Sequence, residues 1–205
     1  MKIGVYGSSF DPVTNVHLWT ASTIFHRKKL DKVLFLPSSN KRRDKNLNIC
    51  DHHRIEMVKL AIKDDPRFEL STEEIYAPLG RQYTYFTMQI LKETYPNDEL
   101  FFVMGADLLE NIGQGSWVQG DKLLEENQFI VMARDGIDML KTIAQSPILR
   151  NVDDGRFQLV DKGLAMEISS TYIREEFSRG GEPRYLLPES CYQYIKEHRL
   201  YQEIE

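Results

Sequence analysis

The first eighteen residues constrain the fold of this chain more than any other stretch. Residues 3–6 predict a short buried strand, and residues 19–25 predict the body of a helix. Between them, residues 7–12 form a turn of small and turn-forming residues. A strand that enters a helix through such a turn creates an anion site in α/β proteins, because the backbone N–H groups there carry partial positive charge. The sequence therefore predicts a phosphate site at this turn, with His17 facing it from the first turn of the helix.

The same turn also has a plainer interpretation. A glycine followed by two serines and an Asp-Pro pair is a common end to a strand, and a histidine near a helix start usually caps the helix or lies on the surface. Short glycine-rich matches also have a high false-positive rate. The turn alone therefore leaves both interpretations open.

The composition of the 205 residues is that of an ordinary globular protein. Hydrophobic residues make up 41% and charged residues 28%, which is enough apolar material for a sizeable core. No apolar run approaches the roughly 20 residues that span a bilayer, and no basic segment followed by an apolar one opens the chain, so we expect a cytoplasmic protein without a membrane partner. Cys50 and Cys191 lack metal-ligand spacing, which favours reduced thiols and no metal site. The formal net charge of −5 argues against a nucleic-acid partner.

The order of apolar runs predicts a parallel sheet covered on both faces. Residues 32–36 form a near-continuous apolar run, which is typical of such strands. Further strands are predicted at residues 68–70, 100–104, 128–132 and 157–160, and helices at residues 51–63 (with Asp51 as the cap), 83–95, 122–127, 138–144 and 168–179. We expect an α/β protein with a Rossmann-like doubly wound parallel sheet. It should form a single domain over residues 1–205, with a small C-terminal helical part at about 168–205.

Four cations follow the strand at residues 32–36. Lys41, Arg42, Arg43 and Lys45 lie close together in a chain that is acidic elsewhere. A solvated loop is the plain interpretation of such a cluster. Ligands of open α/β sheets, however, bind at the carboxyl ends of the strands, so this loop is placed where a small phosphorylated ligand would be met.

Other candidate side chains follow two further strands. Asp107 comes after Gly105, where its carboxylate can accept hydrogen bonds from ribose hydroxyls, and Arg134 occupies the same edge. Trp117 lies in a glycine-rich connection. Its ring either stacks on a heterocycle, an interaction worth about 1 to 3 kcal/mol, or fills the core beneath the loop. Both interpretations of Trp117 stay open.

Two helix starts carry hydroxyl side chains. Tyr83 and Thr84 open one helix, where they can hold a small polar ring, although an aromatic residue there more often belongs to the core. Ser169 and Ser170 open another, and Arg174 on its first turn can add charge-assisted hydrogen bonds to phosphate. Serines at a helix start are ordinary caps in most proteins. Their combination with Arg174 and with the separate turn that carries His17 is less ordinary, and it favours a second phosphate site here.

Two strings resemble the signatures of a known superfamily. Residues 7–17, Gly-x-x-Phe-Asp-Pro-x-Thr-x-x-His, resemble the first motif of the nucleotidylyltransferases, and residues 168–174 resemble their ISSTxIR motif. The second string and the segment after it are similar to the branch that makes the dinucleotide of NAD, most closely the bacterial nicotinate (nicotinamide) mononucleotide adenylyltransferases. The resemblance spans nearly the whole chain.

The resemblance implies a reaction and a set of site residues. AMP would pass from ATP, bound with Mg²⁺, to nicotinate mononucleotide, giving nicotinate adenine dinucleotide and pyrophosphate. The implied catalytic residues are His17, Thr14 and Lys41. The implied ATP-binding residues are Gly7, Ser8, Ser9, Phe10, His17, Gly105, Asp107, Ile168, Ser169, Ser170 and Arg174. The implied acceptor-binding residues are Lys41, Tyr83, Thr84, Trp117 and Arg134.

Several positions depart from that branch and keep alternatives open. Thr14 stands where the NAD branch has His and looks like pantetheine-phosphate adenylyltransferase, so phosphopantetheine is an alternative acceptor, as is nicotinamide mononucleotide. Val16 replaces the usual Gly and Phe86 a frequent Asp, and residues 41–43 replace a Pro-His-Lys loop. A nucleotide-binding regulatory module without turnover is the alternative from another class. The acid or amide preference and a homo-oligomeric state stay open.

Overall fold

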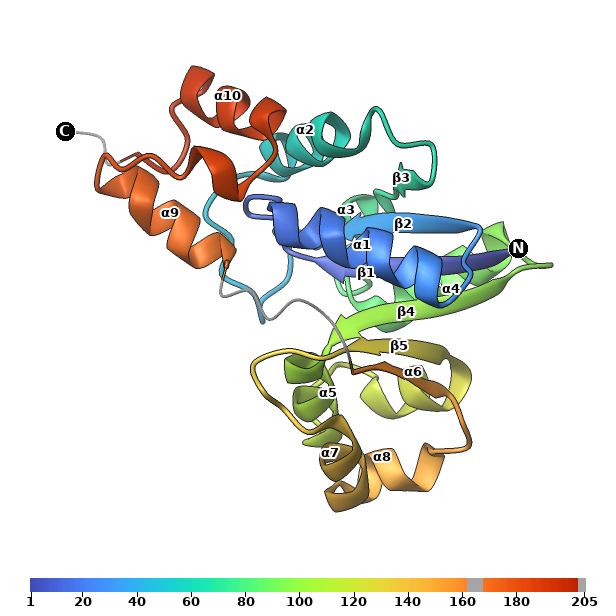
Figure 1. The fold of residues 1–205 in the computed structure, drawn as a ribbon. Helices are drawn as coiled ribbons and strands as arrows, with labels where there is room; N and C mark the ends of the chain where they lie inside the picture. Colours follow the sequence, from blue (N-terminus) through green and yellow to red (C-terminus); the bar gives the residue numbers. More distant parts are fainter. Residues whose placement is uncertain (162–167, 203–205) are drawn as a thin grey trace.

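A six-stranded sheet organises the part of the chain that the computed structural model describes, residues 1–161 and 168–202 (Figure 1). The strands are β1 (Lys2–Ser8), β2 (Lys32–Pro37), β3 (Phe68–Leu70), β4 (Glu99–Gly105), β5 (Gln128–Met132) and β6 (Phe157–Val160). All neighbouring strands are parallel, in the order β3-β2-β1-β4-β5-β6. This order confirms the predicted Rossmann-like, doubly wound sheet.

Helices cover both faces of the sheet. One face carries α1 (Asn15–Arg27), α2 (Asp51–Ile62), α9 (Ser170–Ser178) and α10 (Glu189–Glu197). The other carries α4 (Thr84–Thr94), α5 (Ala106–Gly113), α6 (Gly120–Glu126), α7 (Met139–Gln145) and α8 (Pro147–Val152). The short helices α3 (Glu73–Tyr76) and η1 (Arg184–Leu186) lie in connections. A search of residues 1–161 and 168–202 finds no helix with the length and apolarity needed to cross a bilayer.

Side chains alternate along the strands between two separate cores. In β4, Phe101 and Val103 enter the core under α1 and α2, whereas Phe102 and Met104 enter the core under α4 and α5. Successive side chains of a strand point to opposite faces, so a strand covered on both sides needs apolar residues at every position. Two covered faces therefore explain the near-continuous apolar runs of the sequence.

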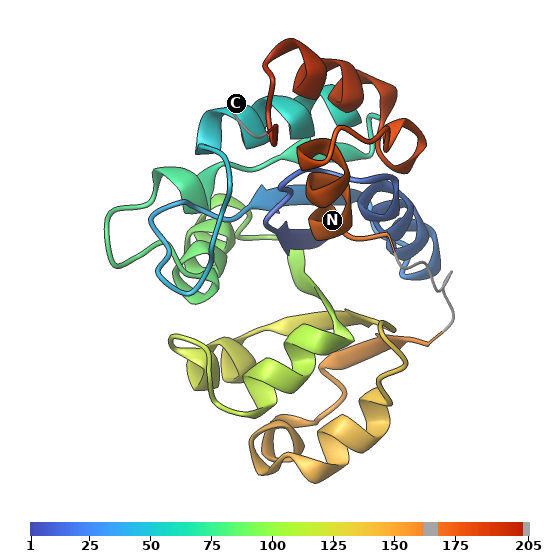
Figure 2. The same cartoon turned by 90° about the vertical axis from the view of Figure 1, so that its left-hand side faces the viewer.

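Helix α10 packs against α2, far from it in sequence (Figure 2). The thiol of Cys191 on α10 donates to the carbonyl of Met57 on α2 at 3.2 Å, and both side chains are fully buried. Burial also raises the pKa of the Cys191 thiol to about 12, so the residue behaves as a packing group. The expected helical part thus contains α9, η1 and α10, and its last residues, 203–205, lie outside the described chain.

Helix starts are where the structure differs from the sequence-based prediction. Cys50, and not Asp51, is the N-cap of α2. The Asp51 carboxylate instead accepts a hydrogen bond from the backbone N–H of Asn40 at 2.9 Å and pairs with Arg54. Helices α3, α5 and α8, of 4, 8 and 6 residues, were not predicted, because helices this short present too few turns for an apolar period to show.

Arg54 joins three segments at the edge of the sheet that carries the first motif. Its side chain is completely buried. One guanidinium nitrogen donates to the carbonyl of Ser9 at 2.7 Å, and another donates to Asn40 Oδ1 at 2.8 Å and pairs with Asp51. A buried guanidinium is tolerated only when such partners replace its water. Arg54 therefore holds the turn after β1 against the loop after β2 and the start of α2.

Replacing Arg54 by methionine should lower the free energy of unfolding by about 3 kcal/mol, because its partners lose their hydrogen bonds inside the protein. Arg43, an exposed arginine of the neighbouring loop, provides the matched control, and Arg43→Met should change stability by less than about 0.5 kcal/mol. Urea denaturation followed by circular dichroism measures both. A loss below about 1 kcal/mol for Arg54→Met would show that the buried network contributes little.

Candidate active site

The winding of the sheet reverses between β1 and β4. β1 pairs with β2 on one side and with β4 on the other, and the chain leaves these strands at Ser8 and Gly105. In open α/β sheets the ligand crevice lies outside the carboxyl ends of the strands at this reversal. Residues 9–14 and the start of α5 therefore flank the same crevice.

A buried phenylalanine fixes the turn of the first motif. Phe10 has no exposed surface, and its φ of +47° lies in the left-handed region. Its ring meets the rings of Tyr6 and His17 edge-on, with centroid separations of 5.7 and 5.0 Å. Packing between β1 and α1 thus stabilises a backbone conformation that costs about 1 to 3 kcal/mol for a residue other than glycine. The Phe10 side chain is a packing group, so only its backbone is placed to meet a nucleotide.

Asp11 is the polar centre of the same turn. Its side chain is 1% exposed, and one carboxylate oxygen accepts hydrogen bonds from the backbone and side chain of Asn48, at 2.8 and 2.9 Å. The other oxygen accepts from the hydroxyl of Tyr201 at 2.7 Å. Burial and the Asp11 charge both raise the pKa of Tyr201. The motif aspartate therefore ties the turn to the basic loop and to the end of the chain.

His17 lies in the first turn of α1 with its ring anchored by Thr14. The Thr14 backbone N–H donates to His17 Nδ1 at 2.9 Å, and Thr14 Oγ1 lies 2.9 Å from the same nitrogen. Because Nδ1 accepts, the proton of the neutral ring must sit on Nε2, which lies 3.4 Å from Ser8 Oγ at the end of β1. Burial, with the positive charge of Arg134 nearby, lowers the pKa of His17 to about 3. The imidazole is thus a neutral N–H donor at physiological pH.

The second motif docks directly on the first. The hydroxyl of Ser170 donates to the carbonyl of Pro12 at 2.8 Å, and Arg174 donates to the carbonyl of Asp11 at 2.6 Å. About 160 residues of sequence separate the partners of each bond. The two strings that sequence analysis selected as phosphate grips therefore meet in space.

Hydroxyl groups gather at the N-terminus of α9. Ser169 is the N-cap, and its Oγ accepts from the backbone N–H of Tyr172 at 3.1 Å, which leaves its own proton free to donate. Arg174 also donates to Thr171 Oγ1 at 3.1 Å, using two of its five N–H groups in the contacts described so far. Ile168 packs against the core under α1 and anchors the segment that precedes the helix.

Asp107 and Arg134 lie together across the crevice from the first motif. Asp107 is in the first turn of α5, and its Oδ2 is 3.7 Å from a guanidinium nitrogen of Arg134. Its Oδ1 is buried without a hydrogen-bond donor in the described residues. A Cβ at Gly105 would collide with that oxygen, so a larger residue there would displace the Asp107 side chain. The Asp107 side chain as a whole is 35% exposed, so the carboxylate can be reached from the crevice.

A cavity of about 270 Å³ opens beside this crevice. Trp117 is half-buried, meets the Phe102 ring edge-on with centroids 6.2 Å apart, and also lines the cavity. It therefore packs on the core and faces a ligand-sized space, which joins the two interpretations left open above. The residues lining the cavity are Gly7, Ser38, Arg42, Asp44, Lys45, Glu74, Thr84, Phe102, Leu108, Asn111, Ser116 and Trp117.

Charged residues form one wall of this cavity. Arg42 pairs with Asp44 and, at 3.2 Å, with Glu74, and its guanidinium lies 5.5 Å from the centre of the Tyr83 ring. Burial raises the pKa of the Glu74 carboxyl, and Arg42 opposes this effect. Tyr83, the N-cap of α4, thus packs against Arg42 without lining the cavity. Thr84 lines the cavity itself.

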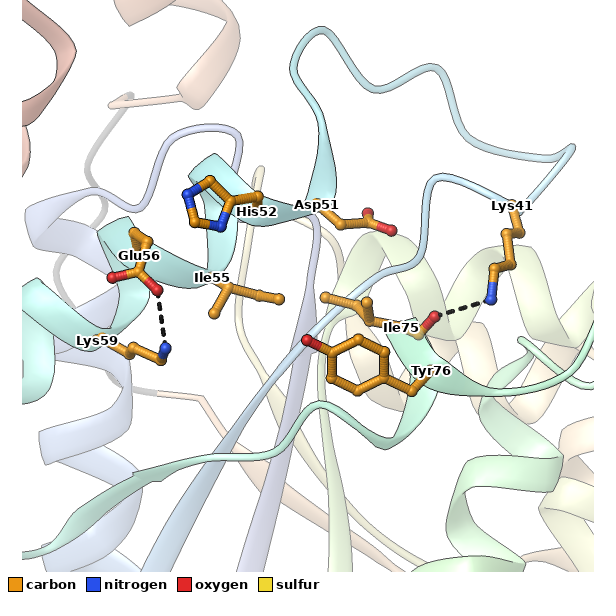
Figure 3. Close-up of a pocket in the computed structure, with 8 residues that line it drawn as sticks. All are labelled: Lys41, Asp51, His52, Ile55, Glu56, Lys59, Ile75 and Tyr76. Carbon is orange, nitrogen blue, oxygen red and sulfur yellow. Dashed lines mark hydrogen bonds and ion pairs between the residues drawn. The ribbon is translucent and has the colours of Figure 1, made fainter. Parts of the chain in front are cut away.

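Lys41 points away from the cavity lined by Trp117. Its ammonium group donates to the carbonyl of Ile75 at 3.2 Å (Figure 3). It also donates to the carbonyl of Ala77 at 3.0 Å. It borders a different hollow of about 380 Å³ between α2 and α3. The charged side chains of that hollow are paired within the protein, as Lys59 is with Glu56 at 2.8 Å. In this conformation Lys41 fastens the basic loop to the end of α3.

The sequence did not single out the charged wall of the cavity. Arg42 and Lys45 belong to the basic cluster, but no sequence pattern tells which of its cations face a ligand. Glu74 lies in a polar stretch without a recognisable motif, and only its burial beside Arg42 marks it.

Comparison with known proteins agrees with this geometry. The profile of the cytidylyltransferase-like family matches residues 5–176. Nicotinate-nucleotide adenylyltransferase of Bacillus subtilis is 36% identical over 203 residues, and a relative from Clostridium tetani is 34% identical over 201, with 98% of each chain covered in both cases.

A solved structure has the same fold. Nicotinic acid mononucleotide adenylyltransferase of Plasmodium falciparum, complexed with NaAD, matches with a TM-score of 0.79 and 26% identity over 98% of this chain and 97% of that one. The predicted resemblance to nucleotidylyltransferases is thus confirmed in sequence and in fold. The chain belongs to the cytidylyltransferase-like family and, within it, to the nicotinate-nucleotide adenylyltransferases.

Proposed function

We propose that this protein transfers the adenylyl group of ATP to nicotinate mononucleotide, forming nicotinate adenine dinucleotide and pyrophosphate. The observation that carries the proposal is the contact between the two phosphate-binding motifs, in which Ser170 and Arg174 rest on the turn that precedes His17. The activity named for the relative from Bacillus subtilis supports the same reaction.

The proposed reaction is a direct displacement at phosphorus. An oxygen of the acceptor's 5′-phosphate attacks the α-phosphorus of ATP and forms the new P–O bond. The bond from the α-phosphorus to the oxygen that bridges to the β-phosphorus breaks, and its electron pair leaves with pyrophosphate. Because the attacking oxygen is already an anion, the protein has only to position the phosphates and stabilise the charge that develops.

His17 acts in this scheme as a fixed hydrogen-bond donor. Thr14 holds Nδ1 as an acceptor, so Nε2–H is directed toward the end of β1, where the α-phosphate would lie. A neutral donor keeps its proton while charge builds on the phosphate oxygens. The hydroxyl of Thr14 orients the ring from behind, which explains how threonine can serve at this position.

The second motif would hold the leaving pyrophosphate. The N-terminus of α9, the hydroxyls of Ser169 and Ser170 and the remaining N–H groups of Arg174 offer donors for the β- and γ-phosphates. On the acceptor side, Trp117 would stack on the pyridine ring beside Thr84. On the ATP side, the partly exposed Asp107 would accept from a ribose hydroxyl.

A magnesium ion would enter with ATP. Within residues 1–161 and 168–202, no three or more His, Cys, Asp or Glu side chains form a group that could hold a metal ion. Mg²⁺ usually keeps several waters and binds through substrate phosphates with one or two carboxylates. Bound in that way, the ion neutralises charge on the leaving pyrophosphate. Asp107, whose side chain is partly exposed at the crevice, is the carboxylate that would meet the hydrated ion.

Pyrophosphate release tests the proposed activity. The full-length protein is mixed with ATP, Mg²⁺ and one of three acceptors: nicotinate mononucleotide, nicotinamide mononucleotide or phosphopantetheine. We expect the highest kcat/KM with nicotinate mononucleotide. Transfer to phosphopantetheine alone would assign the activity that Thr14 suggests, and ATP binding without release from any acceptor would indicate a regulatory module.

Removing the imidazole should slow the chemical step. His17→Ala should lower kcat by about 10² to 10³, the usual effect of losing one donor to the transition state, while the Kd for ATP stays within a few fold. Steady-state kinetics and isothermal titration calorimetry measure the two quantities. Turnover within tenfold of wild type would remove His17 from this role.

Acid should destabilise the protein through the same histidine. The pKa of His17 falls from 6.5 to about 3 on folding, so between these values the unfolded chain binds a proton that the folded protein excludes. Stability therefore falls as the pH falls below 6.5. At pH 5 the loss is about 2 kcal/mol, at roughly 1.4 kcal/mol per pH unit.

A variant without the titrating ring isolates this contribution. The difference in unfolding free energy between wild type and His17→Gln, measured in urea at pH 7.5 and again at pH 5, should change by about 2 kcal/mol in favour of the variant at pH 5. A change below about 0.5 kcal/mol would mean that the folded protein accepts the proton.

Arg174 should act on ATP affinity. Arg174→Ala should raise the KM for ATP by about tenfold or more, because a charge-assisted contact to phosphate is lost. Arg179, exposed at the end of the same helix, is the matched control, and Arg179→Ala should leave the KM within twofold. An unchanged KM in Arg174→Ala would place the triphosphate elsewhere.

A further inference from the structure

Lys45 lines the cavity that holds Trp117 and is a cation without a partner among the residues that the structure describes. Its side chain is half-buried and lines that cavity. Within the described parts of the chain, no hydrogen bond or ion pair within 4 Å reaches its ammonium group. Arg42, on the same wall, differs, because its guanidinium is paired with Asp44 and Glu74. The cavity therefore presents one ammonium group with hydrogen-bonding capacity to spare.

The other cations of the basic loop are turned elsewhere. Lys41 donates to the carbonyls of Ile75 and Ala77 and borders a separate hollow. Arg43 is exposed and does not line the cavity. Of the four cations that the sequence places together, only Arg42 and Lys45 face the cavity, and only Lys45 is unpaired there.

The charged Lys45 ammonium group is destabilised in this cavity until an anion binds beside it. Burial lowers the pKa of Lys45, and the neighbouring charge of Arg42 adds to the effect, while Glu74 and Asp44 only partly oppose it. A buried ammonium is stabilised by a carboxylate within hydrogen-bond distance, which supplies both charge and acceptors. A neutral group in place of the carboxylate would supply hydrogen-bond acceptors but no negative charge.

We infer that Lys45 binds the carboxylate on the pyridine ring of the acceptor and thereby makes the protein prefer the acid over the amide mononucleotide. This inference rests on the function proposed above. It replaces Lys41 by Lys45 as the lysine of the basic loop that meets the acceptor.

The position of Lys45 favours the ring carboxylate over the acceptor's phosphate. The reacting phosphate must lie against the α-phosphate of ATP, at the end of β1 beside His17. The cavity of Lys45 also reaches Gly7 of β1, but its aromatic and hydroxyl lining, Trp117, Phe102 and Thr84, suits a flat heterocycle. A cation in this part of the cavity would contact a substituent of the ring.

Kinetics with the two mononucleotides test the inference. The kcat/KM values for nicotinate and nicotinamide mononucleotide are measured at saturating ATP for wild type, Lys45→Met, Lys45→Arg and Arg43→Met. Lys45→Met should lower the acid-to-amide ratio about tenfold or more, through a loss confined to the acid. Lys45→Arg should keep most of the ratio, since it retains the charge. Arg43→Met, which removes one charge from the same loop, should leave the ratio within twofold.

A pH profile adds a readout that a merely structural lysine would not change. In wild type the acid-to-amide ratio should decline on the alkaline side as Lys45 loses its proton, starting below the usual range of lysine because burial lowers its pKa. The Lys45→Met ratio should be flat over the same range. A wild-type ratio that does not vary with pH would overturn the inference.

The remaining outcomes separate this inference from the proposed function. Equal losses for both acceptors in Lys45→Met, an unchanged ratio, or an equal effect of Arg43→Met would each overturn the role of Lys45 and leave the adenylyl transfer intact. A wild-type protein that prefers the amide would do the same. Failure of wild type to release pyrophosphate with either mononucleotide would instead reject the proposed function, and this inference with it.

Discussion

The site depends on the burial of one carboxylate. Asp11 is almost fully enclosed in the turn between β1 and α1, and three hydrogen bonds from Asn48 and Tyr201 replace its water. Hydrogen bonds to a charged group contribute about 1.5 to 3 kcal/mol each, which offsets a desolvation cost of several kcal/mol. Because the partners come from the basic loop and from the end of the chain, the turn acquires its shape only when all three segments are folded.

Burial and hydrogen bonding also set the protonation state of His17. Its ring is enclosed by Phe10 and Tyr6 and faces the positive charge of Arg134, so the imidazolium form is excluded. Thr14 then decides which nitrogen keeps the proton. A ring that is neutral and held in one tautomer cannot act as a general acid through an imidazolium, yet it offers a fixed N–H donor to an anion. The stability lost in acid and the proposed donor role are therefore two consequences of one desolvated ring.

Sequence reasoning found the two motifs and the sheet because both depend on local patterns. Small residues in a turn after β1, hydroxyls before α9 and apolar runs in the strands are visible along the chain, and they were placed correctly. The direction of loop side chains is not visible, since it follows from contacts made far away in sequence. The Lys41 ammonium group lies at α3 because two backbone carbonyls accept its hydrogen bonds there, whereas Lys45 lines the cavity. Asp51 was misassigned as a cap for the same reason, because Arg54 and Asn40 engage its carboxylate.

The C-terminal helices belong to the site as much as the sheet does. Their contacts with the first motif run through Arg174 to the carbonyl of Asp11, and through Tyr201 to its carboxylate. One aspartate is thus held from two points of the C-terminal segment, on its backbone and on its side chain. A shift of α9 relative to the sheet would move the serines at its N-terminus and, through Asp11, the turn that leads to His17. Binding of a triphosphate across both motifs would therefore stabilise the contact of α9 with the turn before α1, because a ligand that contacts two segments favours the state in which they are correctly spaced.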